Sequence, residues 1–174
     1  LQGGAIELAW NFSPESTAGA QRVLSADADS YIADGLRAMG ELDATVLLRI
    51  GAEMNNWSNC DPAVYIQAFQ KIARQARQYD NIKLVFSPDN VSNRNVSFQD
   101  FYPGDEYVDW IGVSTYHNSN YANYNGGTGT YSFSDTKYSN DAYYGMGIYD
   151  SDPLTILRPI ADFAQTHGKP MMIS

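Results

Sequence analysis

Five short apolar runs, each followed by polar residues, constrain the fold of this chain most strongly. Each run is four to six residues long and is bounded by Gly, Pro, Asn or Asp, and several are almost continuously apolar. Runs of this kind predict β-strands covered on both faces, as in a parallel sheet. The predicted strands are residues 5–10, 45–50, 82–86, 108–113 and 170–173.

Helical signals lie between the predicted strands. Apolar side chains recur near helical spacing over residues 31–39, ahead of the second strand. Asp61 and Pro62 supply an N-cap and a proline at the first helical position. They predict an amphipathic helix that ends near Tyr79.

A further helix is predicted to begin at the Asp-Pro pair of residues 152–153 and to end at Gly168, a suitable C′ residue. Pro159 is expected to kink or restart this helix. Strands that alternate with helices imply βαβ units and right-handed crossovers. The sequence therefore predicts an α/β fold with residues 1–174 as a single domain. Residues 114–151 form a long loop rich in Tyr, Asn, Gly and Ser, typical of a binding loop or of disorder.

The charge balance excludes several classes of partner. Eleven Lys and Arg side chains face twenty Asp and Glu, which gives a formal net charge of −9. This balance argues against nucleic acids and anionic membrane surfaces, which attract basic patches. No apolar run approaches the roughly 18 residues of a membrane span, so membrane insertion is not expected. The sequence lacks the common motifs of nucleotide, zinc and serine-hydrolase sites.

The most informative candidate for chemistry is Glu53, which follows the second predicted strand directly. Asn55, Asn56 and Trp57 come next, and they offer hydrogen-bonding groups and a flat ring to a sugar. A carboxylate at the carboxyl end of a barrel strand is well placed as a general acid/base. The alternative is a solvated loop glutamate beside a tryptophan that packs in the core.

Arg49 interrupts the same apolar strand. In a barrel its side chain would point inward, and burial of its charge would require a carboxylate partner. We therefore include Arg49 among the candidate substrate-binding residues.

Other predicted strands also end in polar or aromatic residues. Trp10 and Asn11 end the first strand, where an aromatic platform for substrate and a core tryptophan are equally compatible with the pattern. Asp89 follows the third strand as a binding residue or an ordinary turn residue. Tyr116 and His117 follow the fourth strand. Tyr116 is expected to orient a catalytic carboxylate or to pack in the core, and His117 to bind substrate or to be an ordinary loop residue.

Two further polar groups are expected to be structural. Asp105, Glu106 and Asp109 form a small acidic cluster whose spacing fits no metal-binding loop. A solvated turn is the favoured interpretation. His167, next to a helix end, is expected to be a cap rather than a ligand.

Several of these segments resemble glycoside hydrolase family 26, the β-mannanase-type barrels. Residues 49–57, with the sequence Arg-Ile-Gly-Ala-Glu-Met-Asn-Asn-Trp, resemble the family's acid/base strand. Residues 101–113 and 168–174 resemble the stretches that include its sixth and seventh strands. The resemblance covers residues 47–174, with a weaker match over residues 4–11.

The resemblance implies a partial TIM (β/α)₈ barrel, with about five parallel strands, and retaining hydrolysis of a β-linked polysaccharide without a cofactor. Glu53 matches the acid/base, and Tyr116 matches a tyrosine near the nucleophile. The nucleophile itself is expected directly after Ser174, about 5–5.5 Å from the acid/base carboxyl group. A full barrel takes about 250 residues, so further barrel segments of a parent chain are expected at both ends. The truncated chain alone should then be inactive.

One position departs from the mannanase pattern, since Ala52 stands where those enzymes usually have His before the acid/base Glu. The expected substrate is therefore mannan or a related β-glycan, hydrolysed by a secreted or cell-surface bacterial enzyme. The alternative is a non-catalytic carbohydrate-binding or cell-surface interaction domain on a degenerate barrel. An acidic residue directly after Ser174 would favour hydrolysis, and a non-acidic one would favour binding.

Overall fold

A computed structural model of the chain describes residues 3–89, 96–114 and 153–174, with backbone only for residues 153–156. Five parallel strands form one sheet in the order β1-β2-β3-β4-β5. Strands that neighbour one another in both sequence and space, all parallel, are the arrangement of a barrel wall. The predicted partial barrel of five parallel strands is confirmed. The strands are β1 Gly4–Trp10, β2 Ala44–Ile50, β3 Ile82–Phe86, β4 Trp110–Val113 and β5 Met171–Ile173.

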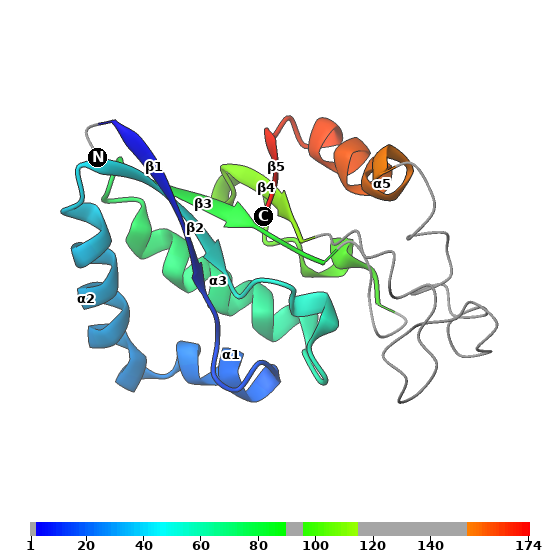
Figure 1. The fold of residues 1–174 in the computed structure, drawn as a ribbon. Coiled ribbons are helices and arrows are strands. Elements are labelled where there is room, and N and C mark those ends of the chain that lie inside the picture. Colours follow the sequence, from blue (N-terminus) through cyan, green and yellow to red (C-terminus); the bar gives the residue numbers. More distant parts are fainter. Residues whose placement is uncertain (1–2, 90–95, 115–152) are drawn as a thin grey trace, which may run out of the picture.

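The helices α1, α2 and α3 gather along one side of β1, β2 and β3, and α5 lies beside β4 and β5 (Figure 1). Short 3₁₀ helices fill several of the connections. The helices are α1 Thr17–Leu24, η1 Ala26–Ala28, α2 Asp29–Gly40, η2 Met54–Asn56, α3 Pro62–Ala76, η3 Phe98–Phe101, η4 Asp105–Tyr107 and α5 Pro153–Thr166. None of the helices in these ranges has the length and apolarity needed to cross a membrane.

The helix boundaries follow the predicted signals closely. Asp61 caps α3 by accepting hydrogen bonds from the N–H groups of Ala63 and Val64, at 2.8 and 3.4 Å. The helix ends at Ala76, three residues before the predicted end, and α5 continues through Pro159 without restarting. Gly168 has the left-handed φ of +62° expected at C′.

Alternation along the strands separates the two faces of the sheet. Val46, Leu48 and Ile50 of β2 are fully buried in the core, whereas Arg49 projects from the opposite face. Because Glu7 of β1 is the register partner of Leu47, it lies on the same inner face as Arg49. This inner face, at the carboxyl ends of the strands, carries the polar residues that follow.

Candidate active site

Glu53 lies just beyond β2 in an uncommon backbone conformation. Its φ and ψ are 60° and 28°, and it is the one non-glycine residue of the described chain with a positive φ. Its N–H donates to the carbonyl of Ser87 at 2.8 Å, which ties the turn to the end of β3. A left-handed conformation costs a non-glycine residue on the order of 1–3 kcal/mol, and such residues concentrate at functional sites. The turn therefore holds Glu53 half-buried in a fixed place at the carboxyl edge of the sheet.

Two asparagines fasten the same turn to Asp89. The carboxamide of Asn55 bonds to the backbone of Asp89, and Asn56 Nδ2 donates to Asp89 Oδ2 at 2.6 Å. Asn55 and Asp89 are buried, and Asn56 borders the cleft next to Glu53. The structure thus brings four of the predicted site residues together, and substrate contact by Asn55 and Asp89 stays a prediction.

A cleft of about 420 Å³ opens above this turn. Asn11 and Glu15 line the same cleft as Glu53, and Asn11 Nδ2 donates to Glu15 Oε1 at 2.9 Å. Carboxylates and carboxamides are suited to the hydroxyl groups of a sugar, because a carboxylate accepts hydrogen bonds and a carboxamide both accepts and donates them. The cleft is lined by Ala9, Asn11, Glu15, Arg49, Ala52, Glu53, Asn56, Trp57 and Ser58.

Arg49 borders the cleft from the inner face of the sheet, and its guanidinium bonds to β1 and to the residues that directly follow β3 and β4. Nη1 pairs with Glu7 Oε1 on β1 at 3.2 Å, which supplies the carboxylate that the sequence required. Nε donates to Ser87 Oγ at 3.0 Å, and Nη2 donates to Ser114 Oγ at 2.7 Å. This inner polar layer (Glu7, Arg49, Ser87 and Ser114) connects β1 and β2 with the ends of β3 and β4.

Trp57 packs beneath the turn rather than standing free above it. The side chain is only 4% exposed and meets Phe12 and Tyr65 edge to face. Trp57 Nε1 donates to the carbonyl of Ala52 at 3.1 Å, and Tyr65 Oη donates to the carbonyl of Ile50 at 2.8 Å. Burial raises the pKa of Tyr65 well above its usual value. Trp57 therefore supports the Glu53 turn, and its stacking on a sugar stays a prediction.

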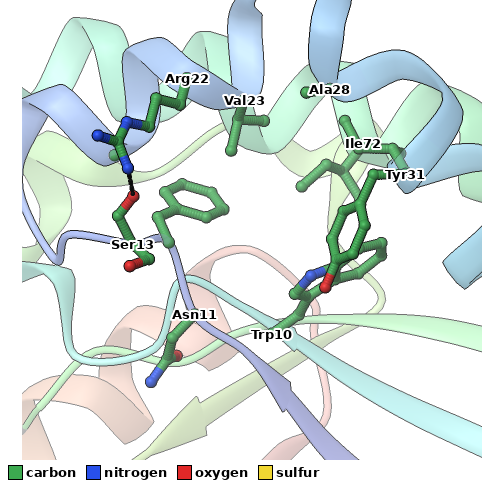
Figure 2. A pocket seen from close by; sticks show the side chains of 11 residues that line it. Trp10, Asn11, Ser13, Arg22, Val23, Ala28, Tyr31 and Ile72 are labelled. Carbon is green, nitrogen blue, oxygen red and sulfur yellow. Dashed lines mark hydrogen bonds between the residues drawn. The ribbon is translucent and has the colours of Figure 1, made fainter.

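Trp10 lies in a second pocket, of about 300 Å³, on the helix-covered side of β1 (Figure 2). Figure 2 shows the rings of Trp10 and Tyr31 together on one side, with Arg22 bonded to the Ser13 carbonyl on the other. Asn11 borders both this pocket and the Glu53 cleft. Contact of Trp10 with substrate stays a prediction.

The remaining candidates divide into two groups. Tyr116 and His117 lie outside the described residues.

Asp105 lies at the opposite edge of the sheet, ahead of β4, where it accepts a hydrogen bond from Tyr102 Oη at 2.8 Å and pairs with His167 Nδ1 at 2.7 Å. The Tyr102 bond and then His167 lower the pKa of Asp105, and burial raises that of Tyr102. Asp109 accepts both Nη1 contacts of Arg77 and the N–H of Leu84. Asp105 and Asp109 of the acidic cluster thus make structural contacts. No group of three or more carboxylate, His or Cys side chains that could hold a metal ion occurs in the described part of the chain.

Residues 8–135 match the family model described as glycosyl hydrolase family 26. The chain belongs to this family. The resemblance to the family is thereby confirmed, and the match includes the motifs at residues 49–57 and 101–113.

The similar curated proteins are named as mannan hydrolases. A mannan endo-1,4-β-mannosidase of Bacillus subtilis is 37% identical over 108 residues, which cover 53% of this chain and 29% of that protein. A second one, from Bacillus subtilis strain 168, is 34% identical over 108 residues with the same coverage.

Solved structures of mannanases share the fold of this family 26 chain. A Bacillus subtilis mannanase has a TM-score of 0.52 at 21% identity, with 99% of this chain covering 59% of that one. A modular endo-β-1,4-mannanase of Cellulomonas fimi has a TM-score of 0.64 at 19% identity, with 99% of this chain covering 39% of that one. The chain therefore spans well under two thirds of the length of these relatives.

Sequence reasoning about this family 26 chain did not single out Glu7, Glu15, Ser87 or Ser114. Glu7 could have been found, because it interrupts an apolar strand as Arg49 does and has the opposite charge. The two serines carry a weaker signal, since a serine after a strand is an ordinary loop residue until the sheet order is known.

Proposed function

We propose that the protein is a retaining glycoside hydrolase that cleaves mannan or a related β-linked glycan, with Glu53 as its general acid/base. The observation that carries the proposal is the placement of Glu53. It is held in a left-handed turn at the carboxyl edge of a partial barrel and borders a polar cleft with Asn11, Glu15 and Asn56. The family and its mannan-hydrolysing relatives support the substrate class.

In this mechanism the Glu53 carboxylic acid protonates the glycosidic oxygen as the bond to the anomeric carbon breaks. A second carboxylate attacks that carbon from the opposite side and forms a glycosyl ester. The Glu53 carboxylate then takes a proton from water, whose oxygen displaces the ester and restores both carboxyl groups. The second carboxylate is expected directly after Ser174, next to the carboxyl end of β5.

The proposal also implies which residues contact the substrate and where the protein acts relative to the cell. Asn11, Asn56 and Glu15 supply hydrogen bonds for sugar hydroxyls, and Arg49 borders the cleft from below. Because a polysaccharide is too large to cross a membrane unaided, we expect the protein to act as a secreted or cell-surface enzyme.

Replacement of Glu53 by Gln in the full-length protein tests the proposal. We expect a loss of about 10²–10⁴-fold in the rate of mannan hydrolysis, which is the range for a general acid/base. An aryl glycoside with a good leaving group needs no acid to form the glycosyl ester. Added azide should then attack the anomeric carbon of that ester in the Glu53→Gln variant, which releases the sugar as a glycosyl azide and restores the second carboxylate. Glu41→Gln, at the exposed end of α2, is the matched control. Mannan hydrolysis at the wild-type rate by Glu53→Gln would contradict the assignment.

A non-catalytic carbohydrate-binding domain is the second candidate, because Ala52 replaces the histidine usual in the mannanases. Mannan binding without hydrolysis by the full-length wild-type protein would favour it.

A further inference from the structure

Ser87, the first residue after β3, contacts both sides of the site. Its carbonyl accepts the N–H of Glu53 at 2.8 Å. Its Oγ lies 3.3 Å from Ser174 Oγ, directly after β5. The residue is fully buried, so no solvent competes for these contacts. One residue thus connects the Glu53 turn to the carboxyl end of β5.

Arg49 anchors the Ser87 hydroxyl group through a hydrogen bond of fixed direction. Because Arg49 Nε can only donate, Ser87 Oγ is the acceptor of that 3.0 Å bond. Ser87 Oγ keeps its proton and a second lone pair for the 3.3 Å contact with Ser174 Oγ, in which either hydroxyl can be the donor. Arg49 is itself held by Glu7 and Ser114, so the Ser87 hydroxyl is bonded to a fixed donor rather than to a mobile side chain.

Gly112 of β4 leaves the space in which the two serines meet. A Cβ at this position would lie 2.8 Å from Ser174 Oγ and 3.0 Å from Ser87 Oγ. Any larger residue would therefore push the two hydroxyl groups apart. The contact between Ser87 and Ser174 thus depends on a glycine in the strand between them.

We propose that Ser87 is a positioning residue, which sets the distance between Glu53 and the carboxyl end of β5 through its contact with Ser174. The inference rests on the proposed function, in which the second carboxylate follows β5. Retention requires the two carboxyl groups about 5–5.5 Å apart. A misplacement of about 1 Å can cost on the order of 10²-fold in rate. Ser87 acts through Glu53 and β5 and does not itself touch the substrate.

The test uses Ser87→Ala in the full-length protein, which keeps the carbonyl bond to Glu53 and removes the hydroxyl. We expect kcat to fall on the order of 10-fold or more while KM changes little, because geometry rather than binding is altered. The fall should also appear with an aryl glycoside that has a good leaving group, since attack by the second carboxylate does not depend on acid assistance. Ser25→Ala, a serine between α1 and η1 with its own hydrogen bond, is the matched control and should keep the wild-type kcat.

Ser174→Ala removes the same contact from its other side and leaves the Ser87 side chain in place. If the contact carries the effect, both single variants lose the same kcat, and the double variant loses no more than either one. Losses that multiply in the double variant would overturn the inference. A Ser87→Ala kcat within about twofold of wild type, alongside an inactive Glu53→Gln, would overturn it while leaving the proposed function intact. Full activity in Glu53→Gln would instead remove the proposed function.

Discussion

The carboxamide of Asn55 hydrogen-bonds to both backbone groups of Asp89. The N–H of Asp89 donates to Asn55 Oδ1 at 2.9 Å, and Asn55 Nδ2 donates to the carbonyl of Asp89 at 3.0 Å. Asp89 in turn forms an isolated parallel bridge with Ser114. The side-chain amide of Asn55 thus forms the two hydrogen bonds that the backbone of a neighbouring strand would otherwise form. It links the turn after β2 to the ends of β3 and β4.

Asn55→Asp should destabilise the protein by about 2–4 kcal/mol. The aspartate keeps the shape of the side chain but has no N–H donor, so its charge faces the carbonyl of Asp89 in a site that is 1% exposed. The free energy of unfolding from urea titration is the measurement. Asn59→Asp, on the exposed part of the same loop, should change it by no more than about 0.5 kcal/mol. Equal urea midpoints for Asn55→Asp and wild type would contradict the role of this bond pair.

Trp57→Ala separates a packing role from a stacking role. Because the ring is packed against Phe12 and Tyr65, its removal should lower the free energy of unfolding by about 3–5 kcal/mol. Trp57→Phe keeps most of the packing but loses the hydrogen bond to the Ala52 carbonyl, so a smaller loss, of about 1–2 kcal/mol, is expected. Thermal unfolding and mannan affinity are measured on the same samples. Weaker mannan binding with unchanged stability would instead favour stacking of Trp57 on a sugar.

The strands could be predicted because each is a short run of consecutive, mostly apolar residues, which indicates a buried strand. Residues 82–86 are apolar except for Lys83, and the structure buries β3 on both faces apart from that residue. Helix α1, in contrast, has only eight residues, several of them polar and one a glycine. The helix is therefore too short to show a recognisable helical spacing of apolar residues. Its place depends on packing against α3, which is a tertiary effect.

The candidate site was predictable only in part, for a related reason. Glu53 could be found because a carboxylate directly after a strand has a defined place at the sheet edge. The orientation of Trp57 could not, since an aromatic residue in a loop fits both a surface platform and a buried support. The partnership of Ser87 with Ser174 joins residues that are 87 positions apart, and it exists only once the strand order is known.

Acid should weaken the protein partly through Asp105. The bond from Tyr102 Oη and the pairing with His167 lower the pKa of Asp105 in the folded state. A lowered folded-state pKa gives stability that is present above the unfolded value, about 4, and that is lost as the pH falls through the folded value. Asp105→Asn should therefore flatten the decline of unfolding free energy below about pH 4, and Tyr102→Phe should flatten it less. The measurement is urea unfolding at a series of pH values, and parallel curves for wild type and Asp105→Asn would contradict the prediction.

The hydrogen bonds from Arg49 to Ser87 and Ser114 should contribute more to the free energy of unfolding than the ion pair between Arg49 and Glu7. Glu7 is 36% exposed at its side chain and Arg49 is 13% exposed, so solvent screens the pair from one side. Glu7→Gln should therefore cost no more than about 1 kcal/mol of unfolding free energy. Arg49→Met removes the donor to two fully buried hydroxyl groups, those of Ser87 and Ser114, and should cost about 2–4 kcal/mol.

Arg37→Met is the matched control for the arginine, because Arg37 pairs with Asp34 on the exposed surface of α2. It should change the unfolding free energy by no more than about 0.5 kcal/mol. If Glu7→Gln costs as much as Arg49→Met, the ion pair rather than the serine contacts holds β3 and β4 to β2. In that case removal of the Ser87 hydroxyl should leave the unfolding free energy almost unchanged, which the same urea titration measures directly.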